Sequence, residues 1–362
     1  MKKLRVMMLI HPDVEPLDHL TDPTDPEYLK RQTEIEVKRA LLDLGHEVEV
    51  VKIYDDLRPL RETIRLWRPH IAFNLMEDFA GERALDFYVV SYLVLAGIPY
   101  TGCNPRGMLL ARDKALSKKI LHYHRIKVPE FRIFPFGKKI KAQKLKNLPY
   151  PMIVKSNLEQ GSVGISQASF VTNEQELLNR IEQQHELTQG DAIAEQYIDG
   201  RELYVGILGN ERLEVLPIRE LSFSDSASQE QRIATYRVKW NDEYRDKIGF
   251  KYCFAKSLEN ATQAKIVKLA RRIYRKLLLS GYARLDLRMD ASGELYVLEA
   301  NPNCAIAHDD DFAEAAKRAG YTYPELINRL LSIGLGNRQL HIDVAGECAH
   351  IRQWAKTCHD HL

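Results

Sequence analysis

The sequence has few cysteines and no excess of charge of one sign. Its five cysteines are scattered along 362 residues, and this small, odd number does not suit a disulfide framework. It favours a reducing compartment, so we expect a cytoplasmic protein. The 52 Lys and Arg residues nearly balance the 50 Asp and Glu residues. This balance gives no electrostatic reason to expect a nucleic acid or an anionic membrane as a partner.

Long hydrophobic runs are also missing. The apolar segment at the N-terminus is short, contains Arg5 and is followed by charged residues and prolines, so it predicts a strand rather than a secretion signal. The apolar stretch 88–100 is well below the roughly 20 residues that a membrane-spanning helix needs. We therefore expect a soluble protein that binds small or nucleotide-sized ligands. Its length allows two or three packed domains.

The first part of the chain alternates short apolar segments with helical patterns. The predicted strands lie at 5–10, 47–53 and 70–75, and the predicted helices lie at 27–44, 58–67 and 82–96. Strands that are separated by helices form parallel sheets. We therefore predict an N-terminal doubly wound parallel-sheet α/β domain at 1–112.

Beyond this domain, strands follow one another more closely, after a helix that begins near Lys114. Strands are predicted at 130–134, 151–155, 165–171, 191–197, 201–208 and 212–220, and helices at 173–187 and 261–280. This order indicates an α+β fold with antiparallel pairs. We expect two parts, 113–198 and 199–335, with a mobile segment at 222–252.

The polar, His-rich tail at 336–362 looks appended to these domains. Its Cys and His residues could ligate zinc, but their spacing fits no common zinc finger.

A predicted β-hairpin carries the sharpest signal for chemistry. Its strands are expected at 282–289 and 294–301. The period of two places Asp286 on the polar face of the first strand, and it places Glu299 and Asn301 side by side on the second. Two carboxylates and an amide oxygen on adjacent strands suit magnesium, which takes oxygen ligands and shares substrate phosphates. In the alternative interpretation this face is solvated, and the neighbouring Arg284 and Arg288 pair with the acids.

A second candidate is the glycine-bearing turn at 160–164, which follows Lys155. Glycines let backbone N–H groups approach phosphate oxygens, and a lysine adds positive charge. The segment is not a P-loop, because the pattern G-x-x-x-x-G-K-[ST] is absent and a strand follows the turn. Taken alone, it also fits a plain hairpin with flexible glycines.

The third candidate is the segment around Glu195. This residue, followed by Tyr197 and Ile198, suits an adenine slot with flat apolar walls. Glu202 could accept hydrogen bonds from ribose hydroxyls. In the alternative interpretation, two surface glutamates flank a core strand.

In kind and in order, these segments resemble the ATP-grasp superfamily and, within it, the D-alanine–D-alanine ligases. The resemblance extends over most of the chain, from about residue 4 to residue 335. Seven segments carry it: FNLMEDFAGE, AGIPYTGCNP, RDKALSKKIL, PMIVKSNLEQGSVGIS, AEQYIDGRELYVGILGN, YRVKW and GYARLDLRMDASGELYVLEANPN.

The resemblance implies a two-part ATP-grasp fold, a homodimer and a role for each matching residue. The implied ATP-binding residues are Lys114, Lys155, Ser162, Val163, Gly164, Glu195, Tyr197, Ile198 and Glu202. The implied ligands of magnesium, or of manganese, are Asp286, Glu299 and Asn301. Lys239 would lie on the terminal phosphate, and Arg284 would steady the transferred group.

The implied reaction joins a carboxylate to an amine. A carboxylate is a poor electrophile, so it first attacks the γ-phosphoryl of ATP to form an acyl-phosphate, which the amine then attacks. We expect an ADP-forming ligase whose partners are small-molecule carboxylate and amine substrates. The alternatives are a D-alanine–D-alanine ligase proper and, from another class, a non-catalytic nucleotide-binding regulatory protein.

Two segments depart from the pattern of these ligases. After Asn301 the glycine of the family's Pro-Gly pair and the following serine are missing, and an acidic run occupies 309–311. Such a run favours a cationic or amine-rich acceptor, but it also fits a helix N-terminus. Near the N-terminus, HPDVEPLD replaces the family's glycine-rich turn. We therefore expect a substrate other than D-alanine, either an amino acid or a small peptide.

Overall fold

The computed structural model describes residues 3–159, 164–223, 228 and 249–336. The chain forms two compact units. The first contains the residues up to 101 together with those from 327 onward, and the second contains 102–326. No helix in the described ranges is both long enough and apolar enough to cross a membrane. All but the first residue of the predicted tail lies outside these ranges.

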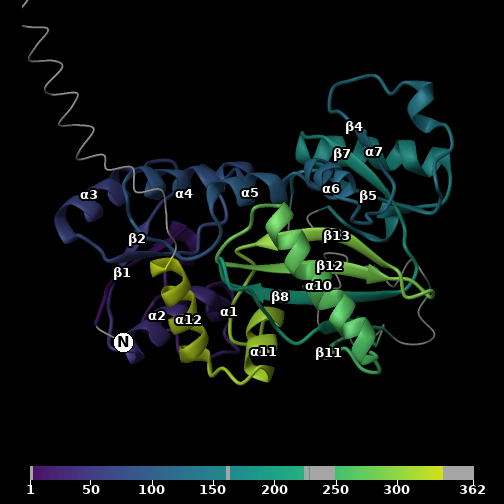
Figure 1. Ribbon diagram of the computed structural model, residues 1–362. Coiled ribbons are helices and arrows are strands. Elements are labelled where there is room, and N and C mark those ends of the chain that lie inside the picture. The colour runs from purple at the N-terminus through teal and green to yellow at the C-terminus, as the bar shows by residue number, and fades with distance from the viewer. Residues whose placement is uncertain (1–2, 160–163, 224–227, 229–248, 337–362) are drawn as a thin grey trace, which may run out of the picture. The chain divides into compact units, whose positions relative to one another are not determined.

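A three-stranded parallel sheet forms the centre of the first unit (Figure 1). β1 (Arg5–Ile10) lies between β2 (Glu47–Lys52) and β3 (Ile71–Asn74). The last five residues of β1, VMMLI, are all buried, as expected for the central strand of a sheet that is covered on both faces. A parallel bridge between Ala72 and Tyr100 extends the sheet beyond β3. The predicted parallel sheet is confirmed.

The predicted helix 27–44 is interrupted. It consists of α1 (Pro26–Lys30) and α2 (Gln32–Asp43), because Arg31 leaves the helical conformation with φ −115° and ψ 13°. The guanidinium of Arg31 donates to the carbonyl of Glu27 at 3.1 Å, and this carbonyl would otherwise continue the helix. The backbone N–H of Arg31 donates instead to the Tyr28 carbonyl.

The other two helices predicted in this unit are close to their expected positions. α3 (Arg58–Trp67) coincides with the prediction at 58–67. The predicted helix 82–96 begins with a 3₁₀ turn (Arg83–Leu85) and continues as α4 (Asp86–Leu95).

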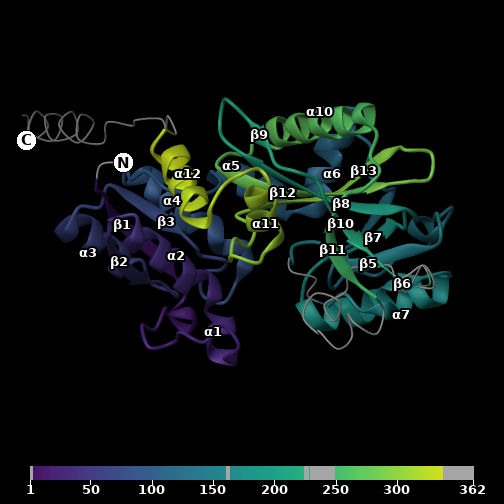
Figure 2. The ribbon, with the colours of Figure 1, turned by 90° about the horizontal axis from the view of Figure 1, so that it is seen from below.

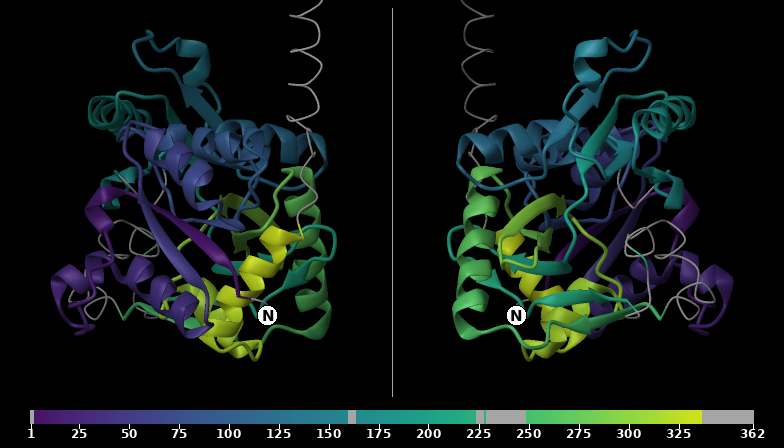
Figure 3. Two further views of the ribbon diagram at one scale, coloured as in Figure 1. Left: turned by 90° about the vertical axis from the view of Figure 1, so that its left-hand side faces the viewer. Right: turned by 90° about the vertical axis from the view of Figure 1, so that its right-hand side faces the viewer.

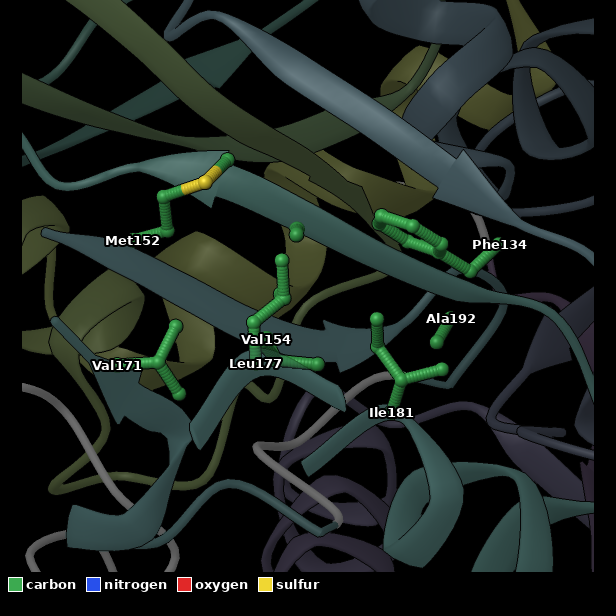
Figure 4. Close-up of a cluster of buried hydrophobic side chains, with 8 residues drawn as sticks. Phe134, Met152, Val154, Val171, Leu177, Ile181 and Ala192 are labelled. Carbon is green, nitrogen blue, oxygen red and sulfur yellow. The ribbon is translucent and has the colours of Figure 1, made fainter. Parts of the chain in front are cut away.

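A four-stranded antiparallel sheet forms the first part of the second unit. Its order is β4 (Phe131–Phe134), β7 (Ala192–Gln196), β5 (Met152–Ser156) and β6 (Phe170–Val171). α7 (Glu174–Thr188) packs on this sheet and directs Leu177 and Ile181 toward the buried side chains of the strands, as Figure 4 shows. The antiparallel arrangement predicted for this part is confirmed.

The strand predicted at 165–171 is mostly absent. Only Phe170–Val171 pairs with β5, and a 3₁₀ turn (Gln167–Ser169) precedes it. The hydroxyl of Ser169 accepts the backbone N–H of Ser166 at 3.1 Å, so local side-chain bonds replace strand pairing.

A larger sheet forms the second part of this unit. Its order is β11 (Lys251–Phe254), β10 (Arg219–Ser222), β8 (Arg201–Leu208), β12 (Tyr282–Met289) and β13 (Leu295–Pro302), with β9 (Glu214–Val215) beside β8. The long helix α10 (Asn260–Lys276) packs along β8 and β9 (Figures 2 and 3). Its apolar stripe is buried as predicted, at Ile266, Ala270, Ile273 and Leu277.

Two predicted elements of this part are corrected. The strand expected at 212–220 is divided into β9 and β10, and Pro217, which lacks a backbone N–H, lies between them. The helix expected at 261–280 ends at Lys276, and Leu278 adopts a left-handed φ of 56°.

Four more helices complete the described chain. α6 (Lys114–Tyr123) begins where the sequence predicts a helix. α11 (Asp311–Arg318) begins at the acidic run, where one interpretation placed a helix N-terminus. The other two, α5 (Pro105–Arg112) and α12 (Tyr323–Leu335), were not predicted.

Gly281 precedes β12 at a position where a side chain does not fit. Its φ is +70°, and a Cβ would lie 2.1 Å from the Gly102 carbonyl oxygen. We expect Gly281→Ala to destabilise the protein by more than about 2 kcal/mol, because the clash adds to the backbone strain. Gly293 is a matched control, with a φ of +78° and no atom within 4 Å of its Cβ position. Gly293→Ala should cost about 1 kcal/mol in urea unfolding, and equal losses for both variants would contradict the expectation.

Candidate active site

Both sheets of the second unit line one cleft. Its empty volume is about 660 Å³, counted together with its open mouth. The lining residues are Ile153, Lys155, Ile165, Glu195, Gln196, Tyr197, Ile198, Glu202, Tyr204, Asp286, Arg288, Leu298 and Glu299. They include seven of the predicted site residues. The structure therefore brings together segments that lie more than 140 positions apart in the sequence.

The hairpin of β12 and β13 contains a β-bulge at the cleft. Asp286 pairs with Glu299 and Leu287 pairs with Val297, so Leu298 is an extra residue on β13. A bulge turns two successive side chains toward the same face. Leu298 and Glu299 accordingly both line the cleft, while Val297 is buried on the other side.

The oxygen atoms of the predicted metal ligands converge beside this bulge. The Asn301 amide nitrogen donates to Asp286 Oδ2 at 3.0 Å and lies 3.5 Å from Glu299 Oε1. A half-turn of the amide would present its oxygen to the same point. The donor set is two carboxylates and an amide. No group of three or more His, Cys, Asp or Glu residues suited to a metal occurs in the described ranges. These three ligands are too few to hold a metal by themselves. They fit a magnesium ion whose remaining ligands are phosphate oxygens.

Arg284 connects this cluster to helix α11. Its guanidinium donates to both oxygens of Asp286 at 2.8 and 3.0 Å, lies 4.0 Å from Asp311 Oδ2, and stacks 4.3 Å from the centre of the Tyr204 ring. The ion pair expected in the alternative interpretation is thus present. The solvated face is not, because Asp286 is only 2% exposed.

Three lysines lie around two glutamates next to the cluster. Lys155 and Lys118 approach the two oxygens of Glu195 at 3.2 and 3.3 Å, and Lys114 lies 4.0 Å from Glu299. Lys118 was not predicted as a site residue. Its ammonium also donates to the carbonyl of Leu298, the bulged residue.

Burial changes the protonation of these lysines. Desolvation lowers the pKa of Lys114 to about 8, against the attraction of Glu299, and it lowers the pKa of Lys118 as well. It acts on Lys155 in the same direction. There, the combined attraction of Glu195 and Glu299 is larger, and the pKa of Lys155 is raised.

The other end of the cleft has flat and apolar walls. The ring of Tyr197 contacts Phe170 edge to face, with centroids 5.1 Å apart, and Ile198 follows it. Glu195 and Glu202 are 3% and 7% exposed, so the interpretation as surface glutamates is wrong. Glu195 Oε1 is buried and lies 3.3 Å from the ammonium of Lys118. A carboxylate oxygen can accept more than one hydrogen bond, so a base amino group could add a second donor.

Of the glycine-bearing turn at 160–164, the structure describes only Gly164. Gly164 has a φ of +70°, and a Cβ there would lie 2.8 Å from the Leu187 side chain. Arg180 of α7 donates to its carbonyl. Ser162, Val163 and Lys239 lie outside the described ranges, so their predicted roles stay predictions.

The acidic run at 309–311 begins helix α11, as one of its two interpretations predicts. Asp310 is the N-cap residue and accepts the backbone N–H of Ala307 at 2.7 Å. Asp311 pairs with Arg219 at 3.2 Å. Asp309 remains exposed beside His308.

Cys304 lies near this helix start and is buried. Desolvation raises the pKa of its thiol to about 12, so the side chain is a small hydrophobic residue and not a nucleophile.

The comparisons with known proteins agree with this fold and site. The family described as D-ala D-ala ligase C-terminus matches residues 122–332, more than half of the chain. A D-alanine–D-alanine ligase of Carboxydothermus hydrogenoformans is 30% identical over 83% of this chain and 92% of its own length. An uncharacterised protein, y4sG, of Sinorhizobium fredii is 32% identical over 82% of this chain and 85% of its own.

Solved structures show the same fold. A D-alanine–D-alanine ligase of Bacillus anthracis, crystallised with ATP, has a TM-score of 0.70 at 21% identity and covers 92% of this chain and 97% of its own. The VanG D-Ala:D-Ser ligase of Enterococcus faecalis has a TM-score of 0.67 at 18% identity, with coverage of 92% and 100%.

The two-part fold with its cleft defines an ATP-grasp protein, and the comparisons make the class specific. The chain belongs to the D-alanine–D-alanine ligase family of ATP-dependent, C–N bond-forming ligases. Membership in a family of enzymes favours the ligase over the non-catalytic regulatory protein.

The lowered pKa of Lys114 predicts a pH dependence of ATP binding. The side chain is cationic below about pH 8 and neutral above it. The dissociation constant for ATP, measured by calorimetry, should therefore rise about tenfold between pH 7 and pH 9.5, as one charge-assisted contact is lost. Arginine stays charged throughout this range, so Lys114→Arg should remove most of the rise. If the dissociation constant of Lys114→Arg rose as much as that of the wild-type protein, the pH dependence would come from another group.

Proposed function

We propose that this ligase forms an amide bond between the carboxylate of one amino acid and the amine of another through an acyl-phosphate, with ADP and phosphate as products. One observation carries the proposal. A single cleft places apolar walls and acceptor groups suited to a nucleoside beside a cluster of lysines and oxygen ligands suited to its phosphates.

The residues of the cleft would have different roles in phosphoryl transfer. Lys114 and Lys155 would attract the phosphates of ATP, and Arg284 would stabilise charge on the group in transfer. Phosphoryl transfer depends on alignment and charge stabilisation more than on covalent help. Magnesium held by Asp286, Glu299 and Asn301 would neutralise phosphate charge. The buried surroundings strengthen each of these interactions.

The named relatives favour D-alanine as the carboxylate substrate, and we propose it as the first donor. A second candidate, with an amine-rich acceptor that carries no free carboxylate, is favoured by a separate observation. The guanidinium of Arg284 already faces the carboxylates of Asp286 and Asp311. Its charge is thereby offset, so an acceptor that brings a further carboxylate gains less from it.

Glu299→Gln tests the metal cluster. The change keeps the shape of the side chain and removes one negative charge, so we expect turnover to fall at least about a hundredfold and magnesium affinity to weaken. ATP hydrolysis coupled to ligation and magnesium titration calorimetry would measure both effects. Glu294→Gln is the control, because Glu294 lies on the same hairpin but pairs with Lys127 and Lys265 outside the cleft. Normal turnover and normal magnesium affinity in Glu299→Gln would contradict the proposed magnesium site.

Product analysis tests the substrates. The protein is incubated with ATP, magnesium and a pool of D- and L-amino acids and polyamines, and new amides are identified by mass spectrometry. A D-alanine dipeptide as the main product supports the first proposal and overturns the expectation of a different substrate. An amide of D-alanine with an amine that carries no carboxylate supports the second candidate. ADP release without any amide would contradict both.

A further inference from the structure

Arg288 is a buried arginine of the cleft that the sequence suggested only as a counter-ion. It is 4% exposed and lies on β12, two residues after Asp286. In the antiparallel register of β12 and β8, it stands directly opposite Glu202. Both side chains line the cleft.

The guanidinium holds two separate groups. Nε and Nη2 both donate to Glu202 Oε2, at 3.1 and 2.7 Å, and Nη1 donates to the carbonyl of Ile198 at 2.9 Å. The planar arrangement of its donors lets one arginine make these bonds together, which the single ammonium of a lysine cannot reproduce. The centre of the Tyr197 ring lies 5.1 Å from the guanidinium carbon.

The second oxygen of Glu202 is fixed as well. Tyr204 donates its hydroxyl to Glu202 Oε1 at 3.3 Å. The carboxylate is thus held at both oxygens inside the cleft. Each carboxylate oxygen can accept more than one hydrogen bond, so a fixed Glu202 can still receive a ligand donor, without the entropy loss of ordering a mobile side chain.

We propose that Arg288 is a positioning residue that holds Glu202 as the acceptor for the ribose hydroxyls of ATP, so that the enzyme selects ribonucleotides over deoxyribonucleotides. The inference rests on the proposed use of this cleft for ATP. A nucleotide that lacks the hydroxyl loses one charge-assisted hydrogen bond to Glu202, while Arg288 and Tyr204 still hold the carboxylate.

Binding of three nucleotides tests the inference without knowledge of the amino-acid substrates. Calorimetry with magnesium compares ATP, 2′-deoxy-ATP and 3′-deoxy-ATP. The wild-type protein should bind at least one deoxy analogue about tenfold more weakly than ATP. In Arg288→Lys this ratio should fall toward one, mainly through weaker binding of ATP. Glu202→Gln should lower the ratio in the same way and leaves Arg288 in place.

Arg201→Lys is the matched control. Arg201 lies on β8 like Glu202, and it makes two 2.7 Å hydrogen bonds to Glu220 away from the cleft lining. This variant should keep the full ratio, and thermal unfolding would show whether each variant is folded. The inference is overturned if the wild-type protein binds all three nucleotides alike, or if a folded Arg288→Lys keeps the ratio. A wild-type protein that binds no ATP would instead overturn the proposed function itself.

Discussion

Buried charge is the constraint on which the second unit depends. An ion removed from water loses several kcal/mol of solvation, and only a close partner with good hydrogen bonds offsets the loss. The charged residues of the cleft region therefore have close counterparts, two of the following pairs joining different elements and the third lying within β12. Lys118 has Glu195, Arg288 has Glu202, and Arg284 has Asp286. The same pairs hold the cleft in one shape, because moving one partner would leave the other charge buried without its counter-ion.

This arrangement also leaves an imbalance that suits a polyanion. Lys114, Lys118 and Lys155 gather around only two carboxylates, those of Glu195 and Glu299. In surroundings of low dielectric constant, the remaining positive charge acts strongly on any phosphate that enters. The pKa of Lys114 is low chiefly because burial shields its ammonium from water, and the neighbouring ammonium groups of Lys155 and Lys118 lower it further.

The sequence predicted the fold well where periodicity is strong and local. The alternation in YARLDLRM placed its apolar residues in the core, and the parallel and antiparallel sheets were both expected. The prediction failed where a single residue interrupts a helix or a strand. Arg31 ends α1 through its own side chain, and Pro217 divides a strand. Helix α5 was missed although Asn104 and Pro105 form a typical helix start, so there the signal was present and unused.

Seven residues that line the cleft were named individually from the sequence, but their partners within the site were not. The family resemblance pointed to Glu202 and Asp286, and the structure places both in the cleft. Lys118 lies four positions after Lys114 on one helix, so a shared face could have been inferred. For Arg288 the sequence indicated only its position on the polar face of the predicted strand. Its contact with Ile198 spans 90 positions and depends on tertiary packing.

The extra residue in β13 has a consequence for how this protein can vary. With regular pairing after Val297, the side chains of Glu299 and Asn301 would turn away from Asp286 and into the hydrophobic interior. The number of residues between Val297 and Asn301 is therefore as important as their identity. Insertions in the hairpin turn at 290–293 leave the strands in register, whereas the loss of Ala300 from the strand would place Asn301 opposite Leu285 and turn it away from Asp286. Natural variants of this chain should differ in the length of that turn and agree in the length of that strand.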